Sequence, residues 1–388
     1  MTEQNLQRVI RAILVVATTV LAVVLGVGVF RGELHGAAAS GGLFDSSGGR
    51  AAADLFDPAQ DQGLLLLADD GRRLLTVSVP GGEVTGAVDL PGRAAAIVPT
   101  PGGVSVWVTF TNRQEIEIYD TTELTHQATV RPEGGAGDTP GHLTFSENGD
   151  TLFVTWQETE RISIYRHEMR ELSLRREIPA TDASGTAGPV LRNRRATRLY
   201  RADLSGDLAA FFALNGQRLE SIEIPGGGLQ PDAPPVFTDD STAAWAITAD
   251  GELVGIDEAE ATAHRHEVNF PPALGNSPVV IRGQETRGLV VQSDERGVHR
   301  VDLFDIQNPV ESGHLEPASL DGEERIVSLV AAGNGGALLL TSEGRLITID
   351  GRSLTVVETA EIREEGEPIR PERAVVWAIN EEGNFACF

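Results

Sequence analysis

Short apolar runs alternate with polar turns from residue 54 to the end of the chain. One unit recurs, in which an apolar run, a turn that usually contains glycine, and a second run of alternating character follow one another. Turns such as Asp70-Gly71 and Asp250-Gly251 suit tight hairpins, because aspartate and glycine tolerate the positive φ angles that such turns need. The pattern predicts eight β-hairpins, which begin at Leu64, Val104, Thr151, Leu208, Ala243, Gly288, Ala337 and Ala374.

Two further short runs separate successive hairpins. Residues 84–90 and 356–362 are typical of an outer strand, whereas residues 95–98 and 326–330 are typical of an inner strand. The hairpins are spaced about 45 residues apart, which is the period of a four-stranded propeller blade. The sequence therefore predicts an all-β fold, a single β-propeller of four-stranded blades over residues 54–388.

Eight hairpins favour eight blades, and the alternative is seven blades if the first and last copies share one. A ring must also be sealed, and we expect a strand from residues 51–56 to complete the C-terminal blade. The four tryptophans occupy second-strand positions, where we expect them to pack between blades; they are Trp107, Trp156, Trp245 and Trp377.

One segment, residues 140–156, has the sequence PGHLTFSENGDTLFVTW. It resembles the YVTN-type repeat of bacterial surface and periplasmic propellers, a WD40-like group. In that repeat a strand ending in Ser-Pro-Asp-Gly leads into a strand ending near Tyr-Val; here Ser146-Glu147-Asn148-Gly149 and Phe153-Val154 hold those places. The other blades share only the period. The resemblance implies the fold group that also contains quinoprotein-like and cytochrome-d1-like propellers, and it implies no particular reaction.

An uncharged apolar segment over residues 12–30 precedes the repeats. Its length suits one passage through a bilayer, and Arg8 and Arg11 before it predict a cytoplasmic N-terminus over residues 1–11. Residues 31–53 are small and polar, as in a flexible linker. We therefore expect a single-pass signal anchor in the cell membrane with an extracytoplasmic propeller. The alternative is cleavage near Ala37-Ala38-Ala39, which yields a secreted or periplasmic protein.

Composition excludes several chemistries. The net charge is −26 and the chain contains no lysine, so Schiff-base lysines and Walker-type phosphate loops are excluded and binding to nucleic acid is disfavoured. Cys387 is the single cysteine, so no intrachain disulfide forms. Linear signatures of serine hydrolases, zinc proteases, EF-hands and covalent haem are also missing from the sequence. Whether the protein is an enzyme stays open, with the balance toward a non-enzymatic role.

Two groups of residues are candidate sites. Arginines are concentrated over residues 161–201, where they include Arg175 and Arg176, and guanidinium groups suit carboxylate or phosphate partners. The alternative for these arginines is ion pairing with neighbouring Asp and Glu. The protein-docking candidates are Arg192, Arg194, Arg195, Arg198 and Arg201. His264 and His266 share one face if their segment is a strand, and His142 begins an inner strand; these three are candidate ligands for a transition metal, although no cofactor is otherwise predicted.

These features favour a protein-binding or scaffolding module that serves an envelope or membrane complex. The alternative is a periplasmic propeller that binds a metal or cofactor, such as a metallochaperone or a quinoprotein-like or d1-haem-like protein. The scaffolding function needs no linear motif, whereas the alternative needs histidine, arginine or tryptophan side chains that converge on the central channel.

Overall fold

The chain forms two compact units, Met1–Gly48 and Gly49–Phe388. The computed structural model describes residues 60–380 of the second unit except for residues 135–136, 147, 160, 169–170, 179–189, 193–196, 203–205, 213–216, 230–234, 238–242, 267, 269–271, 274–277, 281–286, 303–309, 318–319, 321, 333–334, 365–366 and 370. The predicted anchor, the linker and the domain boundary at residue 53 lie outside these residues. Within them, no helix has the length and apolar character needed to cross a bilayer.

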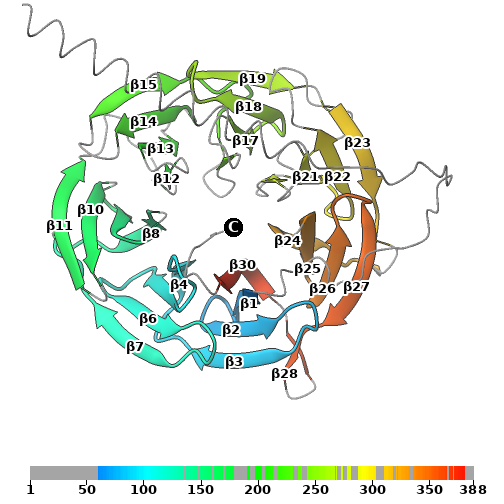
Figure 1. Ribbon diagram of the computed structural model, residues 1–388, viewed down its shortest axis with the longest axis horizontal. Coiled ribbons are helices and arrows are strands. Elements are labelled where there is room, and N and C mark those ends of the chain that lie inside the picture. Colours follow the sequence, from blue (N-terminus) through cyan, green and yellow to red (C-terminus); the bar gives the residue numbers. More distant parts are fainter. Residues whose placement is uncertain are drawn as a thin grey trace, which may run out of the picture. The chain divides into compact units, whose positions relative to one another are not determined.

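Seven four-stranded antiparallel sheets form a β-propeller, with one sheet to each blade (Figure 1). Blade 1 comprises, from the innermost strand outward, β30 (Pro371–Asn380), β1 (Gln60–Ala68), β2 (Arg73–Ser78) and β3 (Val84–Asp89). In the other blades the four strands follow one another along the chain from the centre to the rim.

Blades 2 to 4 consist of β4 (Ala94–Pro99), β5 (Ser105–Phe110), β6 (Ile116–Asp120) and β7 (His126–Val130); β8 (Pro140–Phe145), β9 (Thr151–Trp156), β10 (Ile162–Glu168) and β11 (Glu171–Ile178); and β12 (Leu191–Arg192), β13 (Arg198–Ala202), β14 (Leu208–Phe212) and β15 (Arg218–Ile222).

Blades 5 to 7 consist of β16 (Val236–Phe237), β17 (Ala243–Ile247), β18 (Leu253–Asp257) and β19 (Thr262–His266); β20 (Val279–Val280), β21 (Arg287–Val291), β22 (Val298–Asp302) and β23 (Val310–Leu315); and β24 (Ile326–Ala331), β25 (Gly336–Thr341), β26 (Arg345–Asp350) and β27 (Thr355–Glu361). A two-stranded hairpin, β28 (Arg363–Glu364) with β29 (Glu367–Pro368), follows blade 7.

The prediction of eight blades is wrong, because the first and eighth repeats share blade 1. The eighth repeat supplies one long strand, β30, which pairs antiparallel with β1 from Gln60 opposite Asn380 to Leu67 opposite Arg373. Because β1 begins the described chain as a second strand, its inner edge needs a partner, and β30 fills that place. The ring is thus sealed by the C-terminal repeat; the seam strand expected from residues 51–56 lies outside the described residues.

The tryptophan prediction is confirmed for three residues and wrong for the fourth. Trp107, Trp156 and Trp245 lie on β5, β9 and β17, the second strands of their blades, and each is at most 2% exposed. Trp377 lies on β30, which is an innermost strand. Its misassignment has the same cause as the wrong blade count, since the eighth repeat does not form a hairpin of its own within the described residues.

A short crossover connects the rim of blade 7 to the centre of blade 1. Ile362 in this crossover is fully buried in a cluster that includes Leu75 of blade 1 and Leu340 of blade 7. Arg73 Nη2 donates to Glu364 Oε1 at 2.5 Å, which ties the β28–β29 hairpin to β2. Gly344 has a φ of +81°, and a Cβ there would lie 1.9 Å from the carbonyl oxygen of Ile369, so only glycine lets the crossover approach. Two elements therefore hold blades 7 and 1 together, namely strand β30 and this crossover.

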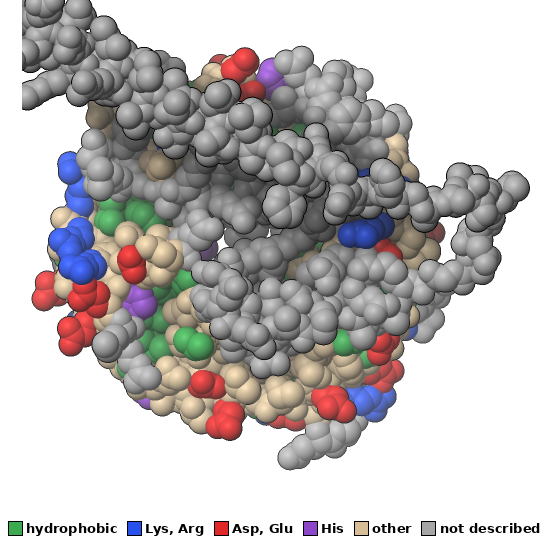
Figure 2. All heavy atoms as spheres, viewed as in Figure 1, with side chains coloured by type: hydrophobic (Ala, Val, Ile, Leu, Met, Phe, Trp, Pro, Cys, Tyr) green, Lys and Arg blue, Asp and Glu red, His purple; other side chains and the backbone are tan. Residues whose placement is uncertain are grey.

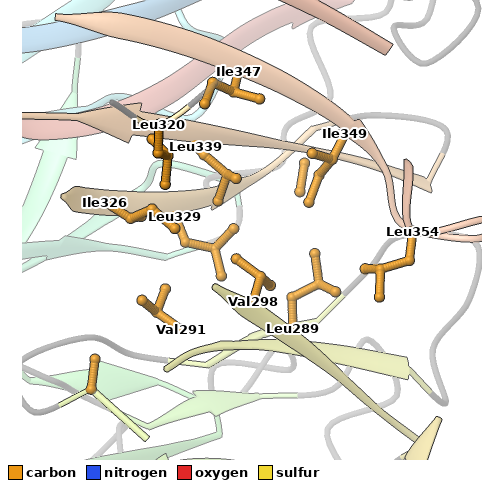
Figure 3. Packing of buried hydrophobic residues seen from close by; sticks show 12 residues of the cluster. Leu289, Val291, Val298, Leu320, Ile326, Leu329, Leu339, Ile347, Ile349 and Leu354 are labelled. Carbon is orange, nitrogen blue, oxygen red and sulfur yellow. The ribbon is translucent and has the colours of Figure 1, made fainter. Parts of the chain in front are cut away.

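Packing between blades explains the sequence pattern. Strands β5 and β25 are buried at every position, because neighbouring blades cover both faces of each sheet, and they are apolar along most of their length. Outer strands such as β3 alternate between exposed and half-buried positions. Figure 3 shows one such interface, where Leu289 and Val298 of blade 6 face Leu339 and Ile349 of blade 7. The hydrophobic core is therefore a series of apolar interfaces between adjacent blades.

Candidate functional site

The arginine candidates separate into two groups. Arg198, on β13, donates through Nη1 to the carbonyl oxygen of Glu258 at 2.8 Å, and its Nε lies 3.8 Å from Glu258 Oε1. Arg201 is only 8% exposed. These two side chains therefore act within the fold, with Arg198 joining blade 4 to blade 5. Arg192 ends the innermost strand β12, whereas Arg194 and Arg195 lie outside the described residues.

The histidine candidates lie on different blades. His142 is half-buried on β8, the innermost strand of blade 3. His264 and His266 lie two residues apart on β19, the outer strand of blade 5, where His266 is 6% exposed and its ring lies 5.5 Å from that of Trp245. His264 Nε2 lies 3.3 Å from Thr262 Oγ1. The inner and outer strand positions keep His142 apart from the other two.

No three histidine, cysteine, aspartate or glutamate side chains gather as a metal-ligand set among the residues that the structure describes. A second histidine pair, His299 and His314 in blade 6, is not among the residues predicted from the sequence. The rings of His299 and His314 stack with centroids 4.2 Å apart, and His299 Nδ1 lies 2.8 Å from Glu311 Oε1. Burial lowers the pKa of His299, and the neighbouring His314 adds to this effect.

A depression of about 460 Å³ lies between blades 2 and 3. Its wall includes His167, whose ring meets Trp107 edge to face at 5.1 Å and whose Nδ1 lies 2.8 Å from the Gly149 carbonyl oxygen. Its polar groups already have partners: Asn148 Nδ2 donates to Asp150 Oδ2 at 2.7 Å, and Glu168 pairs with Arg166. The depression therefore presents a surface whose main polar groups are satisfied.

Asp138 ties two loops of blade 3 together. Its carboxylate accepts hydrogen bonds from the backbone N–H groups of Thr139, Glu158 and Thr159 at 2.6, 2.9 and 2.7 Å, and from Thr159 Oγ1 at 2.6 Å. Burial alone would raise the pKa of Asp138, but these hydrogen bonds outweigh burial and lower its pKa. Asp138 thus joins the start of β8 to the β9–β10 turn.

We expect this carboxylate to make folding sensitive to acid. Because its pKa is lower in the folded state, its contribution to stability is present above its unfolded pKa, about 3.8, and is lost as pH falls below that value. In Asp138→Asn this part of the pH dependence should disappear, and the variant should be less stable than wild type at pH 7. Thermal unfolding midpoints measured between about pH 2.5 and 7 test this. Equal acid sensitivity of the two proteins would contradict it.

The fold and the described side chains define a seven-bladed β-propeller closed by its C-terminal repeat. No known family model matches the sequence, and no curated protein matches it either. A functionally unknown protein from Desulfotomaculum acetoxidans is similar in structure, with a TM-score of 0.58 and 13% identity over 80% of this chain and 98% of that one. The dihydro-haem d1 dehydrogenase NirN is also similar, with a TM-score of 0.58 and 11% identity over 85% of this chain and 77% of that one. At these identities the likeness concerns the fold alone.

Proposed function

We propose that this protein is a membrane-anchored, extracytoplasmic platform that docks a protein of an envelope or membrane complex. The observation that carries the proposal is the closed ring. Because the two ends of the described chain pair at Gln60 and Asn380, the fold is a closed ring that presents loops from seven blades on its surfaces. In this proposal the apolar segment over residues 12–30 is the anchor, and residues 31–53 have the small, polar composition of a linker.

The side chains that look chemically capable are largely engaged in the fold, which supports docking over catalysis. Asp138 holds backbone amides, Arg198 holds Glu258, and His299 packs on His314. Three docking candidates stay in the proposal: Arg192, Arg194 and Arg195. We also propose that the YVTN-type resemblance of residues 140–156 reflects common ancestry with extracytoplasmic propellers.

Photo-crosslinking in intact membranes tests the docking function. A benzoylphenylalanine placed at position 194 of the full chain should give one discrete adduct with a membrane or envelope protein. Replacing Arg192 and Arg195 by alanine should lower its yield about fivefold, since each removes a charge-assisted contact. The matched control places the crosslinker at Arg352, an exposed position on blade 7, and should give no such adduct. If the crosslinker at position 194 gave no adduct, the proposal would be overturned.

A second candidate, a propeller that binds a metal or a d1-haem-like cofactor, is favoured by one observation. His142 is partly exposed on an innermost strand, where an axial ligand would reach the channel. NirN, one of the similar structures, was determined in complex with a molecule named DHE. The purified full chain distinguishes the two functions before any crosslinking. A visible absorbance band or a stoichiometric metal that is lost in His142→Ala would favour the cofactor and count against the platform.

A further inference from the structure

Two arginines on the outer strand of blade 3 have no partner within the part of the chain that the structure describes. Most other arginines there bind a carboxylate, an amide or a backbone carbonyl, as Arg161 does with Glu177 and Arg265 with Glu252. Arg175 and Arg176, on β11, are both exposed, and their guanidinium groups make no hydrogen bond or ion pair with a described residue. In a chain of net charge −26, two adjacent cations with no acidic partner among the described residues need an explanation.

A β-bulge places both side chains on the surface. The register between β10 and β11 shifts after Ile164, which is opposite Arg176, so that Tyr165 is opposite Leu174 and Arg175 is the extra residue. A regular strand would turn one of two neighbours inward. The bulge breaks this alternation, and Arg175 and Arg176 are exposed in succession. The local backbone therefore presents two guanidinium groups side by side.

The same register shift occurs on the outer strands of other blades, but without the charge. The residues at the corresponding bulges are small, neutral or acidic, namely Thr85-Gly86, Gln127-Ala128, Ser312-Gly313 and Val357-Glu358. The bulge is thus a general element of this propeller, and the cationic pair is particular to blade 3. In Figure 2, blue side chains gather at the left rim, where Figure 1 places β11.

We propose that Arg175 and Arg176 bind an acidic segment of a partner protein through two neighbouring carboxylates. Guanidinium groups form forked hydrogen bonds with carboxylates, and two adjacent forks fit two acidic side chains. The nearby Glu168 and Glu177 are already paired with Arg166 and Arg161, so these two carboxylates have cationic partners other than Arg175 and Arg176. The remaining negative charge of the protein repels an extended polyanion such as DNA or an anionic bilayer. Two neighbouring carboxylates need contact only the arginine pair, and acidic groups of the protein farther away than a Debye length of about 8 Å are largely screened. This assignment deepens the proposed docking function and rests on it.

Peptide binding to the full chain in neutral detergent micelles tests the pair. The probe is a fluorescent peptide of about ten residues that alternates glutamate and threonine, and its neutral counterpart alternates glutamine and threonine. Fluorescence anisotropy should show that Arg175→Ala/Arg176→Ala raises the Kd for the acidic peptide about fivefold or more at about 50 mM salt. The Kd of Arg175→Lys/Arg176→Lys should lie between those of wild type and the alanine variant. Lysine keeps the positive charge but cannot form the forked pair of hydrogen bonds that a guanidinium group makes. The neutral peptide should not bind.

Arg72→Ala/Arg352→Ala is the matched control, since both side chains are exposed and have no ion pair with a described residue. It should change the Kd by less than about twofold. Unchanged affinity in the Arg175/Arg176 variant overturns the assignment. So does arginine-dependent binding of duplex DNA, or of vesicles with about 30% phosphatidylserine, in place of the peptide. Self-association of the variant with unaltered peptide binding would also overturn it, because the pair would then only protect a strand edge. Because this assay needs no native partner, it tests the arginine pair independently of the crosslinking experiment, which tests the docking function.

Discussion

Removal of residues 371–388 is expected to open the propeller and to lower its thermal unfolding midpoint by roughly 10 °C or more. The deletion takes away β30, which pairs with β1 from Gln60 to Ala68, and it leaves the inner edge of β1 without hydrogen-bond partners. It also uncovers leucines of β1 that are fully buried in the intact ring, among them Leu64 and Leu66. Circular dichroism should record the lower midpoint, and an apolar dye should bind the opened ring.

Two variants make this prediction specific. Truncation of residues 381–388 alone leaves β30 whole and should keep the wild-type midpoint. A circular permutant that joins Asn380 to Gln60 by a short turn, with new ends between residues 365 and 366, should also fold, because these two residues already pair across the antiparallel ladder. If the 371–388 truncation melted like wild type, the closing role of β30 would be refuted.

Breaking the buried ion pair of blade 7 is expected to have the next largest effect. Glu324 is 2% exposed at its side chain and Arg345 17%; Arg345 Nε donates to Glu324 Oε1 at 2.8 Å, and its Nη2 contacts the other carboxylate oxygen. Arg345→Met leaves the Glu324 carboxylate buried without its cation, which should lower the free energy of unfolding by about 3 to 5 kcal/mol. Urea unfolding at pH 7 measures this change.

The double variant Arg345→Met/Glu324→Leu serves as the informative comparison. It removes both charges, so we expect it to recover most of the lost stability. Arg166→Ala breaks a pair whose partners are 54% and 60% exposed, and it should change stability by no more than about 0.5 kcal/mol. The effect would not come from an uncompensated buried charge if Arg166→Ala lost as much stability as Arg345→Met. The same holds if the double variant lost as much stability as Arg345→Met.

Strand positions could be predicted because each repeat carries its own information. Hairpin turns such as Asp250-Gly251 and the tryptophans of β5, β9 and β17 are local signals, and the structure bears them out. The blade count depends on a contact between residues about 300 positions apart, the pairing of β1 with β30, and no local pattern distinguishes a strand that starts a blade from one that completes another.

The candidate site was harder to predict, because the partners of charged side chains are set by the fold. Arg198 and Arg201 look like surface residues in sequence, yet the structure binds one to Glu258 and buries the other. Arg175 and Arg176 stand in an ordinary alternating segment, and only the bulge opposite Ile164 exposes both. A single-residue register shift of this kind leaves no recognisable signal in one sequence.

The position of β30 also determines when, during synthesis, the ring can close. Blade 1 receives its innermost strand only after residue 380 has left the ribosome, when blades 2 to 7 have already been synthesised. Until then β1 has an uncovered inner edge, which is open to pairing with other chains. A chain that ends before β30 lacks the strand that closes the ring, so it keeps the unpaired edge of β1 that the finished protein covers.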